Sequence, residues 1–165
     1  MAKETYTVLF LCTGNSARSI MAEAVLNRMG RGRFRAFSAG SHPQGAVHAL
    51  TLETLQGARL PTEGLRSKSW DEFARPEAPP LDFVFTVCDK AAAEACPVWP
   101  GQPMTAHWGV EDPAAVDGDG AVQRAAFKKT LVTMSRRIEL LLALPLDKID
   151  SLALKERLTT IGKSK

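Results

Sequence analysis

The sequence predicts an α/β protein: a single domain with a four-stranded parallel sheet flanked by helices on both faces. Three observations support this fold class. Short apolar runs alternate along the chain with segments of helical periodicity, which is typical of parallel sheets covered by helices. The first apolar run is nearly continuous, as expected of a strand buried on both faces. The 165 residues, 45% of them hydrophobic, suffice for one core, and no linker divides the chain.

Local patterns place the elements of the first half. Strand-forming residues fill 5–11, and apolar residues then recur at helical spacing over 20–29 up to Gly30, which is a helix C-terminal signal. A short strand is expected at 35–37. A helix follows at 46–55 and is closed by Gly57. Three prolines in the six residues 75–80 indicate a loop.

The second half continues the alternation. An apolar strand is expected at 81–87, directly before Cys88, and a fourth strand at 103–107. Between them, the KAAAEA sequence of 90–95 has a high helix propensity. A long amphipathic helix is expected over 121–144, ending before Pro145, and a short helix at 149–158. We expect residues 1–165 to form one domain, with a core of about 5–144 and a C-terminal extension at 145–165.

Composition and charge exclude several classes of protein. A net charge of +3 is too small to indicate a nucleic-acid or membrane binder. The N-terminus has no secretory signal, and no stretch is long enough to span a bilayer. The three cysteines therefore indicate buried thiols or thiol chemistry rather than structural disulfides. We expect a cytoplasmic monomer that binds neither nucleic acid nor membranes.

The segment that joins the first strand to the first helix has the pattern C-x5-R-S. A loop entering a helix N-terminus directs backbone N–H groups and the positive end of the helix dipole to one point, which favours an anion. Gly14 allows tight curvature, and Arg18 supplies a planar fork of donors. Cys12 at the base of the loop is expected to lose its proton easily and to act as a nucleophile. The expected oxyanion-binding residues are Thr13, Gly14, Asn15, Ser16, Ala17, Arg18 and Ser19.

The alternative is that Cys12 is only a buried strand-end cysteine and Arg18 a surface residue of the helix. The position of the motif between a strand and a helix favours the anion loop, because phosphate loops require that context.

The loop resembles a known family. VLFLCTGNSARSIMAEA is similar to the active-site segment of low-molecular-weight tyrosine phosphatases and of the arsenate reductases that share their fold. Asp112-Pro113 resembles the general-acid motif of that family. The stretch TVCDKAAAEACPVWPGQPMTAHWGVEDPA resembles the arsenate reductase branch, which uses three cysteines in series. The resemblance covers about residues 5–142.

The resemblance implies reduction of arsenate to arsenite. Cys12 would attack arsenic while Asp112 helps the leaving oxygen depart as water, and Cys88 would then form a disulfide with Cys12. Cys96 would move that disulfide to Cys88–Cys96, where an external reductant reaches it. No tightly bound cofactor is implied. The reductant would be thioredoxin, or glutathione with glutaredoxin, and phosphate or sulfate would mimic arsenate.

Two departures from the family pattern concern the cysteines. Ala17 stands where many of the reductases carry another cysteine, and the Cys88–Cys96 spacing is one residue longer than in the thioredoxin-linked branch, which leaves the reductant open. A straight helix over 88–96 would separate the two cysteines by ~12 Å. A disulfide tolerates a Cα separation of only about 7 Å. The segment would therefore bend or unwind when that disulfide forms.

Some members of the family bind a potassium ion beside the loop. The matching positions are Asn15, Glu23, Ser38, Ser69 and Asp71, for which a purely structural hydrogen-bonding role is the alternative. Two other functions stay open for the whole chain. One is a phosphatase acting on phosphotyrosine or aryl phosphates through Cys12, with Cys88 and Cys96 incidental. The other is a non-enzymatic sensor of oxyanions or redox state.

Overall fold

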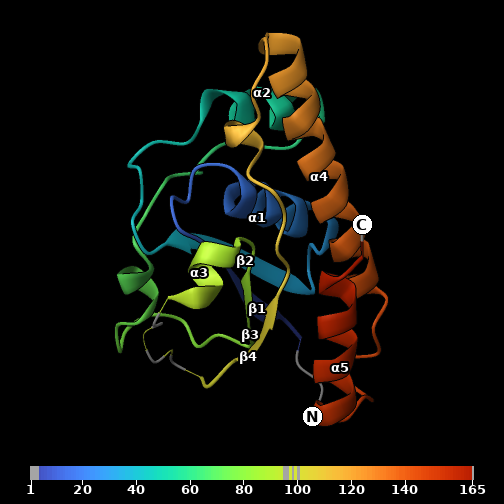
Figure 1. The fold of residues 1–165 in the computed structure, drawn as a ribbon. Coiled ribbons are helices and arrows are strands. Elements are labelled where there is room, and N and C mark those ends of the chain that lie inside the picture. The colour runs from blue at the N-terminus through green and yellow to red at the C-terminus, as the bar shows by residue number, and fades with distance from the viewer. Residues whose placement is uncertain (1–3, 95–96, 98, 100, 165) are drawn as a thin grey trace.

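The structure is a computed structural model that describes residues 4–94, 97, 99 and 101–164 (Figure 1). A sheet of order β2-β1-β3-β4 forms its centre, and every neighbouring pair is parallel. The strands are β1 (Tyr6–Cys12), β2 (Phe34–Gly40), β3 (Phe83–Thr86) and β4 (Met104–His107). The predicted α/β class with four parallel strands is confirmed.

Each predicted helix is present, with shifted ends. The helices are α1 (Arg18–Met29), α2 (Ala49–Gly57), α3 (Asp89–Ala93), α4 (Gly120–Leu142) and α5 (Ser151–Gly162). The prediction of a helix through residue 95 was wrong at its C-terminal end, because α3 stops at Ala93 and Glu94 is extended. Two short 3₁₀ helices, η1 (Trp70–Phe73) and η2 (Pro113–Ala115), were not predicted.

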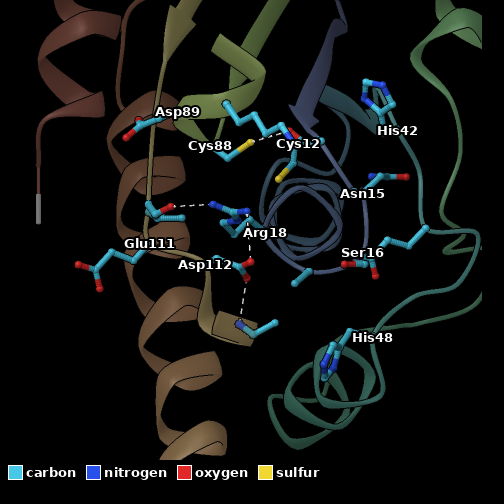
Figure 2. Close-up of a pocket in the computed structure, with 17 residues that line it drawn as sticks. Cys12, Asn15, Ser16, Arg18, His42, His48, Cys88, Asp89, Glu111 and Asp112 are labelled. Carbon is cyan, nitrogen blue, oxygen red and sulfur yellow. Dashed lines mark hydrogen bonds and ion pairs between the residues drawn. The ribbon is translucent and has the colours of Figure 1, made fainter. Parts of the chain in front are cut away.

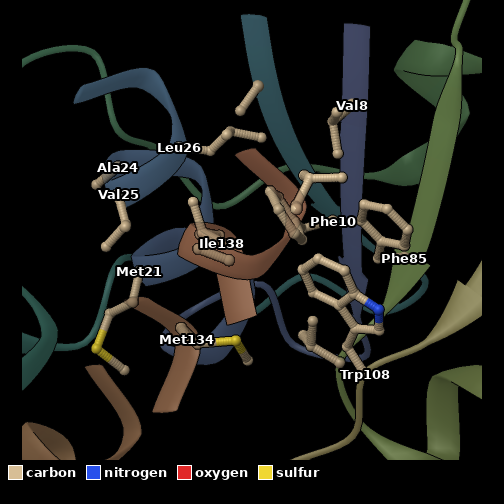
Figure 3. Close-up of a cluster of buried hydrophobic side chains, with 14 of the residues drawn as sticks. Val8, Phe10, Met21, Ala24, Val25, Leu26, Phe85, Trp108, Met134 and Ile138 are labelled. Carbon is tan, nitrogen blue, oxygen red and sulfur yellow. The ribbon is translucent and has the colours of Figure 1, made fainter. Parts of the chain in front are cut away.

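Alternating residues of β1 face the two sides of the sheet, which explains why its apolar run is nearly continuous. Val8 and Phe10 belong to the larger core cluster, which lies between one face of the sheet and helices α1, α4 and α5. In this cluster Phe85 stacks on Trp108 with ring centroids 4.1 Å apart, and Figure 3 shows Met134 and Ile138 of α4 beside them. Large rings packed in this way keep the sheet and α4 in a fixed relation.

The opposite face of the sheet carries a smaller core cluster. Leu9 and Leu11 of β1 pack there with Phe73 of η1 and with Trp99. This face is thus covered by a short 3₁₀ helix and loop segments, whereas the other face carries long α-helices (Figure 1).

The C-terminal segment is tied to the sheet. Leu154, Leu158 and Ile161 of α5 belong to the larger core cluster, and the indole Nε1 of Trp108 donates to the Leu158 carbonyl at 3.0 Å. Arg137 of α4 donates to the carbonyl of Trp108 at 2.7 Å. None of the helices in the described ranges has the length and apolar character needed to cross a membrane.

The carboxyl ends of two central strands bring the predicted nucleophile and the second cysteine to the same edge. β1 ends at Cys12, and Val87, which follows β3, donates to the Leu11 carbonyl at 2.8 Å. Cys88 is the next residue. Ligands of parallel sheets bind beyond this edge.

Candidate active site

The loop between β1 and α1 has its carbonyl groups turned outward. Those of residues 13, 14 and 16 accept hydrogen bonds from the chain that follows β2, namely from the backbone N–H groups of His42 (2.9 Å), Gln44 (3.0 Å) and His48 (3.0 Å). Within the described part of the chain, the backbone N–H groups of residues 14–17 donate to no protein acceptor, and Ala17 gives no side-chain cap to α1. These free donors at a helix N-terminus form a site for an anion.

Asn15 holds the loop in this conformation. It is fully buried and has a φ of 46°, a left-handed backbone geometry that asparagine adopts more readily than most residues. Its side-chain Nδ2 donates to the Ser19 hydroxyl at 2.9 Å, and its Oδ1 accepts from the backbone N–H of Lys68 at 2.8 Å. Asn15 and Ser19 therefore support the loop from behind, which is the structural role considered for Asn15.

Gly40 allows the end of β2 to approach the loop closely. A Cβ atom at this position would collide with the carbonyl oxygen of Thr13 and would lie 2.8 Å from that of Cys12. The close approach explains why β2 ends in a residue without a side chain.

A cavity of about 490 Å³ opens at this edge of the sheet (Figure 2). Residues 12–18 line it together with Cys88, Asp89 and Lys90 at the start of α3, and with residues 110–112. Among the described residues that line the cavity there is no phenylalanine, tyrosine or tryptophan. The cavity thus combines the thiol of Cys12, a ring of polar groups and the second cysteine.

Arg18 is fixed at the floor of the cavity. Its Nη1 donates to the carbonyl of Val110 at 3.1 Å, and its Nη2 lies 3.8 Å from Oδ2 of Asp112. Asp112 is itself held by the backbone, because it caps η2 and its Oδ1 accepts from the N–H of Ala114 at 2.9 Å. The guanidinium and the carboxyl group therefore face the cavity from fixed positions, and their roles as anion ligand and general acid stay predictions.

Cys88 faces Cys12 from the N-terminus of α3. Both thiols are free and buried, and Figure 2 shows their side chains next to one another at the cavity. Cys88 caps α3, and its sulfur accepts from the N–H of Ala91 at 3.4 Å. Helix N-termini and backbone donors stabilise a thiolate.

The two thiols titrate as a pair. The hydrogen bond between their side chains lowers the pKa of Cys88 to about 5 and raises that of Cys12, and burial raises the Cys12 pKa further. The charge of Arg18 and the N–H of Thr13 act in the opposite direction on Cys12. Near neutral pH the pair therefore holds one proton and one negative charge. The easily lost proton therefore belongs to the pair of thiols, and the nucleophilic role expected of Cys12 stays a prediction.

The other predicted site residues are Cys96 and the candidate potassium ligands, and only some of these ligands contact one another. Cys96 lies outside the described residues. Of the candidate potassium ligands, Ser38 donates to Oε1 of Glu23 at 2.5 Å, while Ser69 caps η1 by accepting from the N–H of Asp71. In the described ranges, no group of three or more histidines, cysteines, aspartates or glutamates is arranged to hold a metal ion.

A lysine takes the place expected for the potassium ion. The ammonium of Lys68 lies 3.7 Å from Oε1 of Glu23 and 3.5 Å from the Ser38 hydroxyl, and it donates to the Arg66 carbonyl at 2.9 Å. Burial lowers the pKa of Lys68 and raises that of Glu23, and the attraction between the two opposes both shifts. Glu23 already has a cation beside it, so these residues do not fit a potassium ion.

Comparison with known proteins assigns the chain to a family. The model of the family described as low molecular weight phosphotyrosine protein phosphatase matches residues 7–155. The chain belongs to this phosphatase family. The resemblance stated from the sequence is thereby confirmed.

Relatives of this phosphatase-family chain include arsenate reductases. One from Halalkalibacterium halodurans is 30% identical over 132 residues, covering 80% of this chain and 91% of the relative. A solved structure described as an arsenate reductase in the phosphate binding state is 25% identical, with a TM-score of 0.68 over 84% of this chain and 97% of the other. The thioredoxin-dependent arsenate reductase of Corynebacterium glutamicum is 26% identical, with a TM-score of 0.65 over 90% and 66% of the two chains.

Lys68 and Glu94 were missed by the sequence reasoning. Lys68 is only 7% exposed, but a lone lysine between Ser67 and Ser69 gives no signal of burial. The carboxylate of Glu94 contacts Thr13 in the loop between β1 and α1, whereas the sequence around Glu94 indicated only a helix. Contacts between segments far apart in the chain decide both positions.

Proposed function

We propose that this protein reduces arsenate to arsenite. The observation that carries the proposal is the second thiol, Cys88, which faces Cys12 across the anion loop. A phosphatase of this fold needs a cysteine, an arginine and a general acid, but it has no use for a second thiolate beside the nucleophile. The relatives that are named arsenate reductases support the same conclusion.

The polar lining of the cavity favours a small inorganic anion. The side chains that line it include those of His42, Gln44, His48, Lys90 and Glu111. Apart from the two imidazoles, none of these offers an aromatic face to a phenyl ring. The free N–H groups of the loop and the guanidinium of Arg18 together match a tetrahedral oxyanion.

The first chemical step forms a bond between sulfur and arsenic. Cys12 attacks arsenic and passes its proton to the neighbouring Cys88. Asp112 protonates the departing oxygen, which leaves as water. Arg18 and the loop N–H groups stabilise the charge on the remaining oxygens.

The second step reduces arsenic. Cys88 passes its proton to an oxygen on arsenic, and its sulfur attacks the sulfur of Cys12, so that a disulfide forms and the sulfur–arsenic bond breaks. The bonding electron pair stays on arsenic, which goes from the +5 to the +3 state and leaves as arsenite. In total two thiols and arsenic acid give one disulfide, arsenous acid and water.

Cys96 completes the relay in this proposal. Its thiolate attacks Cys88 and frees Cys12, so that the disulfide comes to lie between Cys88 and Cys96. α3 ends at Ala93 and the backbone of Glu94 is extended, so the helix stops before the segment that leads to Cys96, and this supports the required bend. The thioredoxin dependence named for the Corynebacterium glutamicum enzyme supports thioredoxin as the external reductant.

Phosphatase activity is the second candidate. The family match and the complete set of Cys12, Arg18 and Asp112 support hydrolysis of small aryl phosphates through a phosphocysteine. We expect this to be a side activity, because the wall of the cavity lacks the aromatic side chains that would hold a phosphotyrosine ring.

The proposal is tested by following arsenate-dependent NADPH oxidation, coupled in parallel to thioredoxin with its reductase and to glutathione with glutaredoxin. We expect turnover in the thioredoxin system that is lost in Cys88→Ser and in Cys96→Ser. Hydrolysis of an aryl phosphate by the same variants is the internal control, since Cys12, Arg18 and Asp112 are unchanged. Arsenate turnover that survives in Cys88→Ser would contradict the proposed thiol chemistry.

A further inference from the structure

The carboxylate of Glu94 connects three separate segments beside the active site. Its Oε1 accepts from the Ser41 hydroxyl at 2.8 Å and from the Thr13 hydroxyl at 3.2 Å. Its Oε2 lies 3.5 Å from Nδ1 of His42. Only 20% of the Glu94 side chain is exposed. The end of α3, the chain after β2 and the anion loop therefore meet at one carboxylate.

These contacts coincide with the end of α3. The sequence KAAAEA favours a continuous helix, yet Glu94 has a ψ of 151°, which lies far from helical values. An extended backbone at Glu94 lets its side chain turn back toward Thr13 and Ser41. The position of this carboxylate is thus determined by contacts with the loop rather than by local propensity.

Thr13 lies between Glu94 and Cys88. Its Oγ1 is 3.2 Å from Oε1 of Glu94 and 3.6 Å from Sγ of Cys88. A threonine hydroxyl has a single proton to donate. An ionised carboxylate and a thiolate both accept that proton and offer none in return. Glu94 and the Cys88 thiolate therefore compete for one donor.

We propose that Glu94 is a positioning residue that weakens the acidity of Cys88 by drawing the Thr13 hydroxyl proton toward itself. When Thr13 donates to Glu94, the Cys88 thiolate loses a stabilising hydrogen bond. When Thr13 turns toward Cys88, the thiolate gains that bond. No covalent bond changes in this exchange. The inference rests on the proposed role of Cys88 as the second nucleophile, whose thiolate fraction Glu94 would set.

The other groups that act on the Cys88 sulfur are identified by the structure. They are the Cys12 thiol, the N–H of Thr13 and the N–H of Ala91. The adjacent Asp89 directs its carboxylate to Nε2 of His107 at 2.7 Å, and therefore turns away from the sulfur. Unlike these groups, the hydroxyl of Thr13 can donate its proton to a neighbouring carboxylate, that of Glu94, instead of to the sulfur.

The test measures the pKa of Cys88 without any turnover. In the parent variant Cys12→Ser, Cys96→Ser, Cys88 is the only thiol, and its ionisation is followed by the ultraviolet absorbance of the thiolate during a pH titration. Glu94→Gln keeps the shape of the side chain but weakens the acceptor, and we expect it to lower the pKa of Cys88 by roughly one unit, a tenfold change in the thiolate-to-thiol ratio.

Two further substitutions separate the Thr13 route from a simple charge effect. Thr13→Val removes the shared proton, so Glu94→Gln should then have no effect, whereas Thr13→Ser keeps the hydroxyl and should preserve the effect. Glu111→Gln is the matched control, because Glu111 lines the same cavity with its carboxylate turned away from both cysteines (Figure 2). Circular dichroism of each variant checks that the fold is retained.

The outcomes are decisive in both directions. A pKa decrease in Glu94→Gln that is absent in Glu111→Gln and vanishes with Thr13→Val would support the proposal. An unchanged pKa in Glu94→Gln, or a decrease that persists in the Thr13→Val background, would overturn it. Because the titration needs no arsenate, its failure is distinguishable from a failure of the reductase proposal, which the coupled assay reports.

Discussion

Replacing Lys68 with methionine tests the buried cation behind the anion loop. The side chains of Lys68 and Glu23 are only 6% and 13% exposed, and their charged groups lie 3.7 Å apart. Methionine retains most of the aliphatic volume but leaves the Glu23 carboxylate without its cation. Removing one partner of such a buried pair costs about 3–5 kcal/mol. For a chain of this size we expect a decrease in Tm of roughly 6–20 °C.

The dependence of this loss on pH has a definite sign. Burial already raises the pKa of Glu23, and Lys68 lowers it again, so Lys68→Met should raise that pKa further. A carboxyl group with a raised pKa binds more protons in the folded state than in the unfolded state. The variant should therefore regain stability as the pH falls through the folded pKa toward the unfolded value.

The assay is chemical or thermal unfolding of Lys68→Met, with Lys128→Met as the control for loss of an exposed lysine. The double variant Glu23→Gln, Lys68→Met should recover part of the loss, because it removes the buried charge. Potassium chloride and sodium chloride at equal ionic strength should stabilise the wild type equally. A Lys68→Met loss no larger than that of the control, or a specific potassium effect on the wild type, would refute the reasoning.

Three further predictions concern the loop and its cysteines. Arg18→Lys keeps the charge but loses the planar fork of donors. Phosphate binding, measured by calorimetry, should therefore weaken roughly 10- to 100-fold, as expected for one lost charge-assisted hydrogen bond. Unchanged affinity would argue against Arg18 as an anion ligand. Gly40→Ala forces its Cβ against the Thr13 carbonyl and should lower the free energy of unfolding by about 1–3 kcal/mol; a neutral effect would mean that the loop is not held there. Alkylation of Cys88 by iodoacetamide, followed by peptide mass spectrometry, should persist down to a pH of about 5 and decline below it, because the thiolate is lost as the pH falls through its lowered pKa. A decline centred near the ordinary thiol value would contradict the paired titration.

The strand–loop–helix motif was predictable because its signals are local. The apolar run of β1, the C-x5-R-S spacing and the helical periodicity of α1 lie within one continuous segment. The position of Cys88 beside Cys12 was also predictable, since the carboxyl ends of neighbouring parallel strands share one edge. Asp112 followed from the family resemblance rather than from any local signal.

The features that were missed depend on contacts between distant segments. Lys68 is buried only because Glu23 of α1 and Ser38 of β2 surround its ammonium. α3 ends early because Glu94 accepts hydrogen bonds from Thr13 and Ser41, and these bonds outweigh the helix propensity of the segment. The short η1 helix, capped by Ser69, has no periodic pattern to reveal it. Such positions follow from tertiary packing, which a single sequence does not display.

The most direct test of the reductase account is a single turnover without external reductant. Fully reduced protein is mixed with an excess of arsenate, arsenite is quantified, and disulfides are mapped by peptide mass spectrometry. The account predicts one arsenite for each protein molecule, a Cys88–Cys96 disulfide in the wild type and a trapped Cys12–Cys88 disulfide in Cys96→Ser. Absence of arsenite and of any disulfide, together with brisk hydrolysis of an aryl phosphate by the same sample, would contradict it.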